Sequence, residues 1–293
     1  MTRNTLPWQS KLVLLLVLPA AVASTILLGH WWAVVWPPIV LWAVGLSLLL
    51  GLGAWQTRAA TRGGAFAGAL ITACLVLESA QINLQPWHTA LTPLLAVLLL
   101  TGMATRLGHS RKQALSLAES SQGRNAAQVV ANTGMATWFA QPLVQLSLID
   151  SGLFFSYGMN AVPVLAPMLA VLAEAAADTV SSEIGQAFGG RPRLITTLRP
   201  VEPGTDGGLT LIGTTAGILA AALVTSVGAL TLLGGGWPLF WPAFAGGLFG
   251  LLFDSLLGAT AERRGWLNND LVNFFSTSIA ALFSLLLLAL LPH

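Results

Sequence analysis

The sequence predicts an all-α membrane protein, a polytopic bundle of about nine transmembrane helices. Hydrophobic residues make up 55% of the 293 residues and charged residues only 8%, and the mean hydropathy is +0.76. This composition is typical of chains that fold in lipid. Uncharged runs recur along the whole chain, many of them close to the roughly 20 residues that cross a hydrocarbon core of about 30 Å. Lys and Arg are confined to alternate connections between these runs.

The apolar runs define the expected helices in order along the chain. The nine expected spans cover residues 12–29, 32–53, 63–78, 88–105, 126–149, 156–178, 207–233, 238–258 and 270–291. The first run begins after basic residues and ends near "AVAS", which mimics a signal-peptide cleavage site. We expect it to be retained as the first helix. The stretch "DSGLFFSYG" between the fifth and sixth runs also fits a bend at the membrane interface.

The distribution of positive charge predicts the orientation. With nine spans, every Lys and Arg lies before the first span or in the second, fourth, sixth and eighth connections. The opposite connections contain neither residue type. Because basic residues that flank spans are retained in the cytoplasm, we expect the N-terminus inside and the C-terminus outside. The sequence thus predicts an integral protein of the cell (inner) membrane.

Two further counts limit the possible functions. The single cysteine, Cys74, lies within an expected span, which excludes an internal disulfide and a cysteine metal cluster. The net charge of +2 is spread over several short connections, so we expect no nucleic-acid partner. Lipid headgroups and a phosphorylated substrate are the expected partners of the basic residues. The oligomeric state is not predicted.

The first polar cluster is "GRNAAQVVANTG", residues 123–134. On a helix, Asn125, Gln128 and Asn132 form one stripe directly after Arg124. Amides hydrogen-bond carbonyls, hydroxyls and base edges. Hydrogen bonding between helices is their ordinary role in a membrane bundle. Three amides on one stripe beside an arginine favour a surface that faces a substrate or nucleotide.

The second cluster is "EAAADTVSSEIGQAFGGRPR", residues 174–193. On a helix, Glu174, Asp178 and Ser181 share one face, with Ser182 at its edge and Glu183 on the other side. Two carboxylates one turn apart repel each other unless a cation or a proton lies between them. Acidic residues in or near a span usually mark an ion site, a proton path or a reaction site.

A carboxylate pair beside hydroxyl groups suits Mg²⁺, which takes oxygen ligands and often binds through carboxylates together with substrate phosphates. We therefore assign Glu174 and Asp178 to metal binding and catalysis, and Ser181 and Ser182 to the substrate. The alternative is that the two acids pair internally with Arg124 or Arg191. That alternative is weaker, because Arg is itself a usual phosphate ligand.

The third cluster is "GGRPRLITTLRPVEPGTDGG", residues 189–208. Glycines allow backbone N–H groups to approach a phosphate, and Thr205 with Asp206 has the chemistry of a helix cap. No G-x-x-x-x-G-K-[ST] motif is present, so the chain has no Walker-type phosphate loop. The expected substrate and nucleotide ligands here are Gly189, Gly190, Arg191, Arg193, Thr205, Asp206 and Gly207.

The fourth cluster has two parts. Gly246, Gly250, Asp254 and Gly258 recur every four residues, a spacing that lets helices approach closely. An unpaired carboxylate on such a face is costly. We therefore expect Asp254 to join the site made by Glu174 and Asp178 as a catalytic and metal-binding residue, with Mg²⁺ between the carboxylates.

The last expected helix begins with "NNDLVNFFST". Asn269 and Asn273 in its first turns are expected to contact the substrate or nucleotide. Asp270 either makes a favourable interaction with the helix dipole or adds a further ligand to the metal. The predicted Mg²⁺ ligands are Glu174, Asp178, Asp254 and Asp270.

Five blocks in the same order resemble a known membrane family. They are "GRNAAQVVANTG", "EAAADTVSSEIG", "GTDGGLTLIGTTAG", "GLLFDSLLGAT" and "NNDLVNF". Together they resemble the family that contains plant phytyl-phosphate kinase and animal transmembrane protein 19, over about residues 63–288. We therefore expect two N-terminal helices, residues 1–62, outside the resemblance. Residues 63–293 are expected to form the family membrane domain, with its polar site facing the cytoplasm.

A second, more distant resemblance concerns the acidic stretch alone. "DTVSSEIGQAFGGR" is similar to the Asp-containing, glycine-ended motif of CTP-dependent dolichol and phytol kinases and of CDP-diacylglycerol synthases. Those enzymes bring Mg²⁺ and a cytidine nucleotide to a lipid phosphate. The resemblance implies that Asp178 binds the metal and that Arg191 and the neighbouring glycines bind phosphate.

The two resemblances imply Mg²⁺-dependent phosphoryl transfer from a nucleoside triphosphate, with CTP favoured, to an isoprenoid (prenyl) monophosphate. The partners are then membrane lipid, a prenyl-phosphate substrate and the nucleoside triphosphate. A cytidylyltransferase acting on a lipid phosphate needs the same groups and is one alternative. An ion-coupled transporter or lipid scramblase is another, since buried carboxylates also serve ion coupling. Against transport, the acids gather near helix ends and no inverted repeat is found.

Overall fold

The computed structural model describes residues 7–83, 85–115, 117, 123–150, 162–232 and 236–290. This part of the chain is almost entirely helical, which confirms the prediction of a polytopic helical membrane protein. It contains five helices that are long and apolar enough to cross a membrane. They are α1 (Pro7–Val35), α2 (Pro37–Gln56), α9 (Leu211–Thr231), α10 (Trp237–Leu257) and α11 (Asn269–Leu290).

Six further helices and three short helical turns complete the bundle. The helices are α3 (Arg62–Glu78), α4 (Leu91–Arg106), α5 (His109–Ala114), α6 (Ala126–Ala140), α7 (Pro142–Asp150) and α8 (Ala166–Phe188). The turns are η1 (Pro86–His88), η2 (Val162–Leu165) and the π-helical η3 (Gly258–Glu262), which continues α10. π-Helical turns often lie at functional sites.

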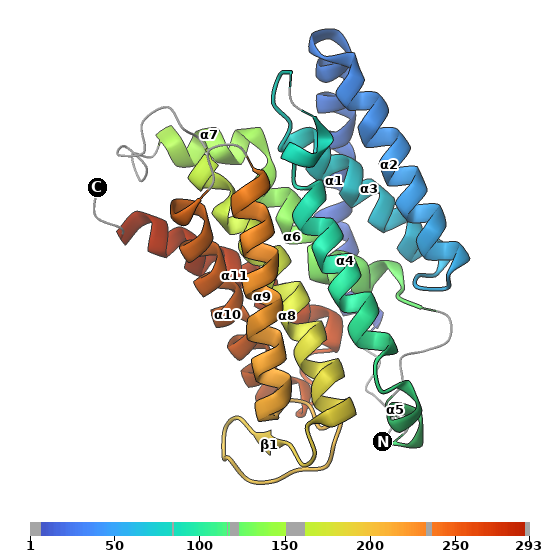
Figure 1. Ribbon diagram of the computed structural model, residues 1–293, viewed down its shortest axis with the longest axis vertical. Helices are drawn as coiled ribbons and strands as arrows, with labels where there is room; N and C mark the ends of the chain where they lie inside the picture. The colour runs from blue at the N-terminus through green and yellow to red at the C-terminus, as the bar shows by residue number, and fades with distance from the viewer. Residues whose placement is uncertain are drawn as a thin grey trace.

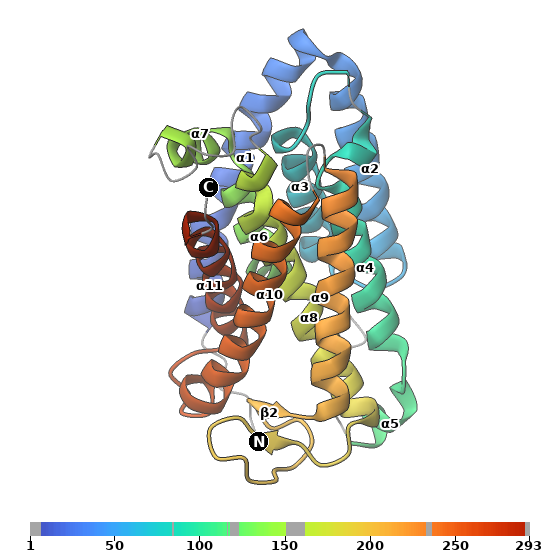
Figure 2. The same ribbon diagram turned by 60° about the vertical axis from the view of Figure 1, so that its left-hand side comes forward.

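Helix α8 is the centre of the bundle. It packs against α4, α6, α9, α10 and α11, while α1, α2 and α3 form an outer group joined through α6 (Figures 1 and 2). The first half of α8 is rich in alanine and almost completely buried. Small side chains allow neighbouring helices to approach closely. In lipid, where no hydrophobic effect drives helices together, this close van der Waals packing stabilises their association. The acidic part of α8 therefore lies inside protein rather than against lipid.

The structure moves one expected helix and divides another. The span expected at 156–178 is α8 at Ala166–Phe188, which contains the whole acidic stretch up to Phe188. Pro167 lies in the first turn of α8, where backbone N–H groups have no partner within the helix, so the N–H that proline lacks is not needed there. The span expected at 126–149 is broken at Gln141, because Pro142 disfavours helix in the residue before it. Residues 151–161, with most of "DSGLFFSYG", lie outside the described residues.

A small sheet qualifies the all-α prediction. Strands β1 (Arg193–Leu194) and β2 (Gly208–Leu209) pair antiparallel and fold the 189–210 connection back on itself. Thr210, rather than Thr205 or Asp206, caps α9: its Oγ1 accepts a hydrogen bond from Gly213 N at 3.0 Å. The Thr205 hydroxyl instead donates to the Glu202 carbonyl at 2.7 Å within the connection.

The polar connections gather at one end of the bundle. Helix α5, the 189–210 connection and the turn between α10 and α11 all lie at the lower end in Figures 1 and 2. The α1–α2 turn and α7 lie at the opposite end (Figure 1). Inside the lower end, buried Lys112 of α5 forms an ion pair with Glu183 of α8, on the side of α8 away from Glu174. This pair ties α5 to the central helix.

Candidate active site

Three carboxylates converge where α8 and α10 cross. Glu174 and Asp178 lie one turn apart on α8, and the Asp254 carboxylate interacts electrostatically with both. Glu174 is completely buried, whereas Asp178 and Asp254 are half-buried. The structure thus brings together acids that are separated by more than seventy residues in the sequence.

The glycine stripe of α10 makes this approach possible. A Cβ atom added at Gly250 would lie 2.6 Å from Glu174 Cγ and 2.8 Å from the Ser276 carbonyl oxygen. Real Cβ atoms essentially never come so close. Gly246 similarly lies against α8 and α11, and Gly258 lies against Gly207 of the 189–210 connection. The close contact predicted from the four-residue glycine spacing is therefore confirmed.

Gly250→Ala is accordingly expected to destabilise the folded protein by about 1–3 kcal/mol, the usual cost of overpacking a tight contact. Gly45→Ala on α2 is the matched control, because a Cβ there meets no atom within 4 Å. Thermal unfolding in detergent measures both variants. An unchanged transition for Gly250→Ala would show that α8, α10 and α11 do not pack this tightly.

Ser276 of α11 completes the carboxylate cluster. It is fully buried and interacts with the side chains of both Glu174 and Asp254. Glu174 Oε1 has no hydrogen-bond partner among the described residues. The sequence reasoning missed Ser276, although it follows Asn273 at the i+3 spacing that continues the same helix face.

Two asparagines extend the cluster to α6. Asn273 of α11 hydrogen-bonds Asn132 in either orientation of its amide. With its nitrogen turned toward α10, it donates to Asp254 Oδ2 at 3.3 Å and accepts from Asn132 Nδ2 at 3.2 Å. Asn132 also donates to the Gln128 carbonyl at 2.8 Å. The site is therefore a contiguous polar layer through α10, α11 and α6.

Arg124 brings the positive charge nearest to the cluster. Its guanidinium interacts with the Asp178 carboxylate, and Nη2 lies 3.5 Å from Thr179 Oγ1. Its backbone is held by the α2–α3 connection: N donates to the Ala59 carbonyl and its carbonyl accepts from Thr61 N, both at 3.0 Å. Gly123, with φ of +76°, permits this close approach. Two segments far apart in the sequence thus position one arginine against α8.

Two of the predicted ligands take part in a helix cap. Asn125 and Gln128 form a reciprocal capping box at the start of α6, with hydrogen bonds of 3.0 and 2.8 Å. The N-x-x-Q spacing is itself a capping-box signature, so the sequence carried this information. Of the predicted amide stripe, Asn132 is the member that reaches the carboxylate cluster.

Asp270 faces α1 rather than the other acids. Its Oδ2 accepts a hydrogen bond from Ser10 at 2.5 Å, next to the contacts that Gln9 makes with the α10–α11 turn. Asn269 is exposed, and its carbonyl lies 3.3 Å from the Asn273 amide. These contacts tie the start of α1 to the start of α11.

The hydroxyl groups on α8 face different neighbours. Ser181 lies against α9, where a Cβ at Gly217 would be 2.9 Å from Ser181 Cβ. Ser182 is exposed and donates to the Thr179 carbonyl at 3.1 Å.

The 189–208 connection lies at the lower end of the bundle and contacts the end of α10, the helix that carries Asp254. Arg191 and Arg193 are exposed, and Arg193 Nη1 donates to the Leu198 carbonyl at 2.9 Å. Gly207, with φ of +74°, would place a Cβ 2.5 Å from the Ser255 carbonyl oxygen, so it joins this connection to the end of α10. Gly190 also has a positive φ, +71°, with open space around it. Gly189 packs against Thr210, and Asp206 is exposed.

The carboxylates do not enclose a metal ion by themselves. Within the described ranges, no three His, Cys, Asp or Glu side chains are arranged so as to hold one. The carboxylates of Glu174, Asp178 and Asp254 are near enough to repel one another. The remaining ligands of a metal ion would have to come from another molecule. Mg²⁺ is commonly bound in this way, through one or two carboxylates and substrate phosphates.

Comparison with known proteins defines the family. The sequence profile described as integral membrane protein DUF92 matches residues 45–281. The chain belongs to this family. The match confirms the family predicted from the five sequence blocks, and it begins within α2. No solved structure matches the chain.

Three relatives show how far the similarity within DUF92 extends. An uncharacterized membrane protein of Methanocaldococcus jannaschii is 36% identical over 194 residues, 66% of this chain and 74% of the relative. The Arabidopsis thaliana protein PGR is 29% identical over 246 residues, 78% of this chain and 80% of the relative. The chloroplastic protein VTE6 of the same plant is 39% identical over 117 residues, 38% of this chain and 34% of the relative.

Proposed function

We propose that the protein transfers the γ-phosphoryl group of a nucleoside triphosphate, CTP in preference, to a prenyl monophosphate at the cytoplasmic face of the membrane. The observation that carries this proposal is the convergence of Glu174 and Asp178 of α8 with Asp254 of α10, together with Arg124, which interacts with Asp178. The resemblance to the phytyl-phosphate kinase family supports the class of acceptor.

The proposed reaction needs charge neutralisation more than proton transfer. A phosphate monoester has a second pKa of about 6, so the acceptor is mostly a dianion at neutral pH. One of its oxygens bonds to the γ-phosphorus, the bond from that phosphorus to the β–γ bridging oxygen breaks, and the nucleoside diphosphate leaves. No proton has to be removed from the acceptor. The protein must therefore align two polyanions and stabilise the charge between them.

The residues of the site have the chemistry for these tasks. Arg124 is placed to neutralise a phosphate beside Asp178 and Thr179. One or two of the carboxylates Glu174, Asp178 and Asp254 would hold Mg²⁺ together with phosphate oxygens, and the unpartnered Glu174 Oε1 supports this role. When bound, Mg²⁺ neutralises phosphate charge and orients the transferred group. Arg191, Arg193 and the glycines of the 189–208 connection are proposed to contact the nucleotide.

A cytidylyltransferase is the second candidate, because the same carboxylates and arginine suit both reactions. The products separate the two. Purified protein is incubated with Mg²⁺, each of the four nucleoside triphosphates and a panel of prenyl monophosphates, and the products are identified by mass spectrometry. A prenyl diphosphate with a nucleoside diphosphate supports the kinase. A cytidine-linked lipid with pyrophosphate supports the cytidylyltransferase instead.

One observation favours ion-coupled transport. Glu78 is buried in α3, accepts a hydrogen bond from Ser24 at 2.6 Å, and its Oε2 has no partner among the described residues. Transport of a phosphorylated lipid without turnover, measured in vesicles, would support this alternative.

Asp254→Asn is expected to raise the Mg²⁺ concentration for half-maximal transfer about tenfold, which corresponds to about 1.4 kcal/mol. The reason is that an amide in place of the carboxylate keeps the contact with Asn273 but binds the cation less strongly. Glu202→Gln, in the exposed part of the 189–208 connection, is the control. A Mg²⁺ dependence identical to that of the wild type would remove Asp254 from the cation site.

The proposed topology has nine spans, with the N-terminus in the cytoplasm. In this arrangement α3, α4, α6 with α7, and α8 cross the membrane in addition to the five long helices. The gathering of the basic connections at one end supports it, since such residues are retained in the cytoplasm.

Single cysteines are expected to report this topology. In a Cys74→Ala background, Ser110→Cys and Thr197→Cys should react with an impermeant maleimide in inverted vesicles but not in intact cells. Gln85→Cys, on the α3–α4 connection, should show the reverse. All three positions are exposed, whereas Cys74 is buried. Labelling of Thr197→Cys in intact cells would contradict a cytoplasmic site.

A further inference from the structure

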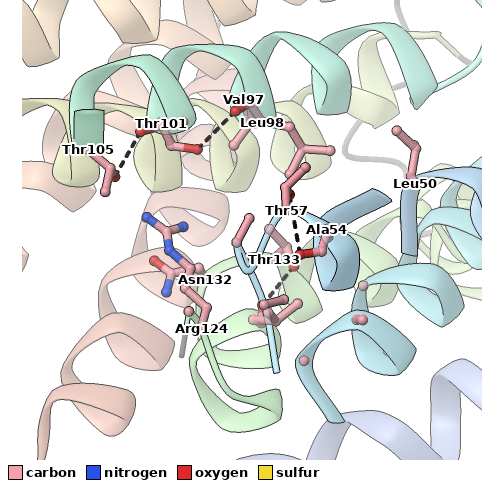
Figure 3. A pocket seen from close by; sticks show the side chains of 18 of the residues that line it. Leu50, Ala54, Thr57, Val97, Leu98, Thr101, Thr105, Arg124, Asn132 and Thr133 are labelled. Atoms are coloured by element: carbon pink, nitrogen blue, oxygen red, sulfur yellow. Dashed lines mark hydrogen bonds between the residues drawn. The ribbon is translucent and has the colours of Figure 1, made fainter. Parts of the chain in front are cut away.

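A cavity of about 690 Å³ lies beside the carboxylate cluster. Helices α2 and α3 form one wall, α4 the opposite wall, and α6 and α8 the inner side (Figure 3). It exists because α4 packs mainly on α8 and α9 and hardly contacts α3. Its volume is within the range of about 300–1,000 Å³ that is usual for small-molecule sites.

The two ends of this cavity differ in chemistry. Toward the upper end, apolar side chains line it from three helices, namely Leu50, Ile71, Leu94, Val97 and Leu98. Toward the lower end, its lining includes Arg58, Arg106, His109 and Arg124. Leu94 and Arg106 are twelve residues apart on α4, so these ends are separated by about 18 Å along the helix. Figure 3 shows Arg124 and Asn132 at one end and Leu50 at the other.

This combination defines the class of ligand. The described residues that line the cavity include Arg58, Arg106 and Arg124 but no Asp or Glu; Asp178, which interacts with Arg124, lies outside the lining. An anionic headgroup is therefore favoured there, and Arg is well suited to bind phosphate. The apolar end provides a path for a hydrocarbon chain at the depth of the membrane.

Two residues connect the cavity to the carboxylate cluster. Arg124 lines the cavity and also interacts with Asp178 on α8. Asn132 lines it and also hydrogen-bonds Asn273, which reaches Asp254. Ala175, the neighbour of Glu174, forms part of the inner side. A phosphate bound to Arg124 would therefore lie next to the carboxylates.

We infer that this cavity is the acceptor site, in which a prenyl monophosphate lies with its chain along α2, α3 and α4 and its phosphate at Arg124. The inference rests on the proposed function for the identity of the phosphate. It assigns α2, whose second half lies within the family match, a direct part in substrate binding. It also separates the acceptor, bound at Arg124, from the nucleotide, bound at the 189–208 connection.

Photo-crosslinking without nucleotide tests the site independently of turnover. The probe is geranylgeranyl monophosphate with a diazirine at the end of its chain, added to purified protein in nanodiscs. Crosslinked peptides are mapped by mass spectrometry. We expect them on α2, α3 and α4, and we expect unlabelled geranylgeranyl monophosphate to protect them. Geranylgeraniol, which lacks the phosphate, and phosphatidylglycerol should protect them at least about tenfold less well.

Two pairs of variants sharpen this test. Gly68 lines the cavity, and a Cβ there would meet a single atom, Val129 Cγ1, at 3.9 Å, so Gly68→Leu places a side chain in the cavity. Gly53→Leu on α2 is its control, because it adds the same side chain outside the lining, where a Cβ meets no atom within 4 Å. Arg106→Gln removes a charge from the cavity mouth, and Arg111→Gln removes one from exposed α5 outside the lining. We expect Gly68→Leu and Arg106→Gln to lower crosslinking about tenfold, the usual scale for a lost charge-assisted contact. The two controls should match the wild type.

The outcomes separate this inference from the proposed function. Protected crosslinks on α2, α3 and α4 without transfer from any nucleotide would support the site and contradict the kinase. Prenyl diphosphate formation that survives Gly68→Leu, with crosslinks elsewhere, would overturn the site and leave the kinase standing. Equal protection by phosphatidylglycerol would make the cavity a membrane-lipid site and also overturn the inference.

Discussion

Replacing Asp178 with asparagine is expected to lower phosphoryl transfer by about 10³-fold, on the scale seen when one electrostatic stabiliser is removed from an active site. Asp178 interacts electrostatically with groups of both charges that the reaction needs, namely Arg124 and the carboxylates Glu174 and Asp254. An amide has nearly the same shape, so packing around α8 should survive while the charge is lost. Transfer is measured with purified protein in nanodiscs at saturating Mg²⁺.

The control for this variant is Asp150→Asn, at the exposed end of α7. Both proteins should elute as single species with unchanged thermal transitions. Wild-type turnover in Asp178→Asn would remove this residue from the mechanism. If Asp178→Asn does not fold, Asp178→Glu is tested in its place. That variant keeps the negative charge but shifts its position, so it should still lose most of the activity.

Replacing Arg124 with glutamine is expected to be almost as damaging, with transfer lowered by about 10³-fold, the lower limit for loss of an arginine that stabilises a transferred phosphoryl group. Arg124→Lys should recover part of the activity, because an ammonium keeps the charge but not the planar pair of donors. Arg263→Gln, in the exposed turn after η3, is the matched control.

A double variant distinguishes a shared role from two separate ones. Since Arg124 and Asp178 interact electrostatically, the effects of Arg124→Gln and Asp178→Asn should be less than additive when combined. Full additivity of the two losses in the free energy of activation would mean that the residues act independently, which the proposed arrangement does not allow.

Hydropathy correctly predicts those helices of this protein whose surfaces face mainly outward, toward lipid. The helices α1, α2, α9, α10 and α11 lie within a few residues of their expected spans, because their apolar surfaces face outward and determine their composition. Helix α8 was displaced by ten residues in the prediction. Its neighbours bury its first half, and it continues through polar residues as far as Phe188, whereas the prediction from hydropathy ends at Asp178.

Some features of the candidate site could be predicted from local sequence spacing, whereas others depend on contacts between distant segments. Helical spacing was sufficient to place Glu174 and Asp178 on one face, and the glycine stripe predicted that α10 would bring Asp254 against another helix. Asn125, predicted as a ligand, also caps α6, a role that the N-x-x-Q spacing indicates. The position of Arg124 depends on backbone hydrogen bonds to the α2–α3 connection, more than sixty residues away in the sequence. The local sequence around Arg124 does not predict such contacts.

The cavity was also beyond prediction from sequence. Its walls come from α2, α3, α4, α6 and α8, and each contributes residues that read separately as ordinary membrane-facing or turn positions. Only the packing of α4 against α8 and α9, away from α3, leaves the space between them.

The most direct test of the central claim follows the label of the nucleotide into the lipid. Wild-type protein and Asp178→Asn are each incubated with geranylgeranyl monophosphate, Mg²⁺ and CTP labelled with ³²P at either the α or the γ position. We predict that only the γ label enters the lipid, as geranylgeranyl diphosphate, and that Asp178→Asn loses this transfer. Entry of the α label, or γ transfer that is unchanged in Asp178→Asn, would contradict phosphoryl transfer at this site.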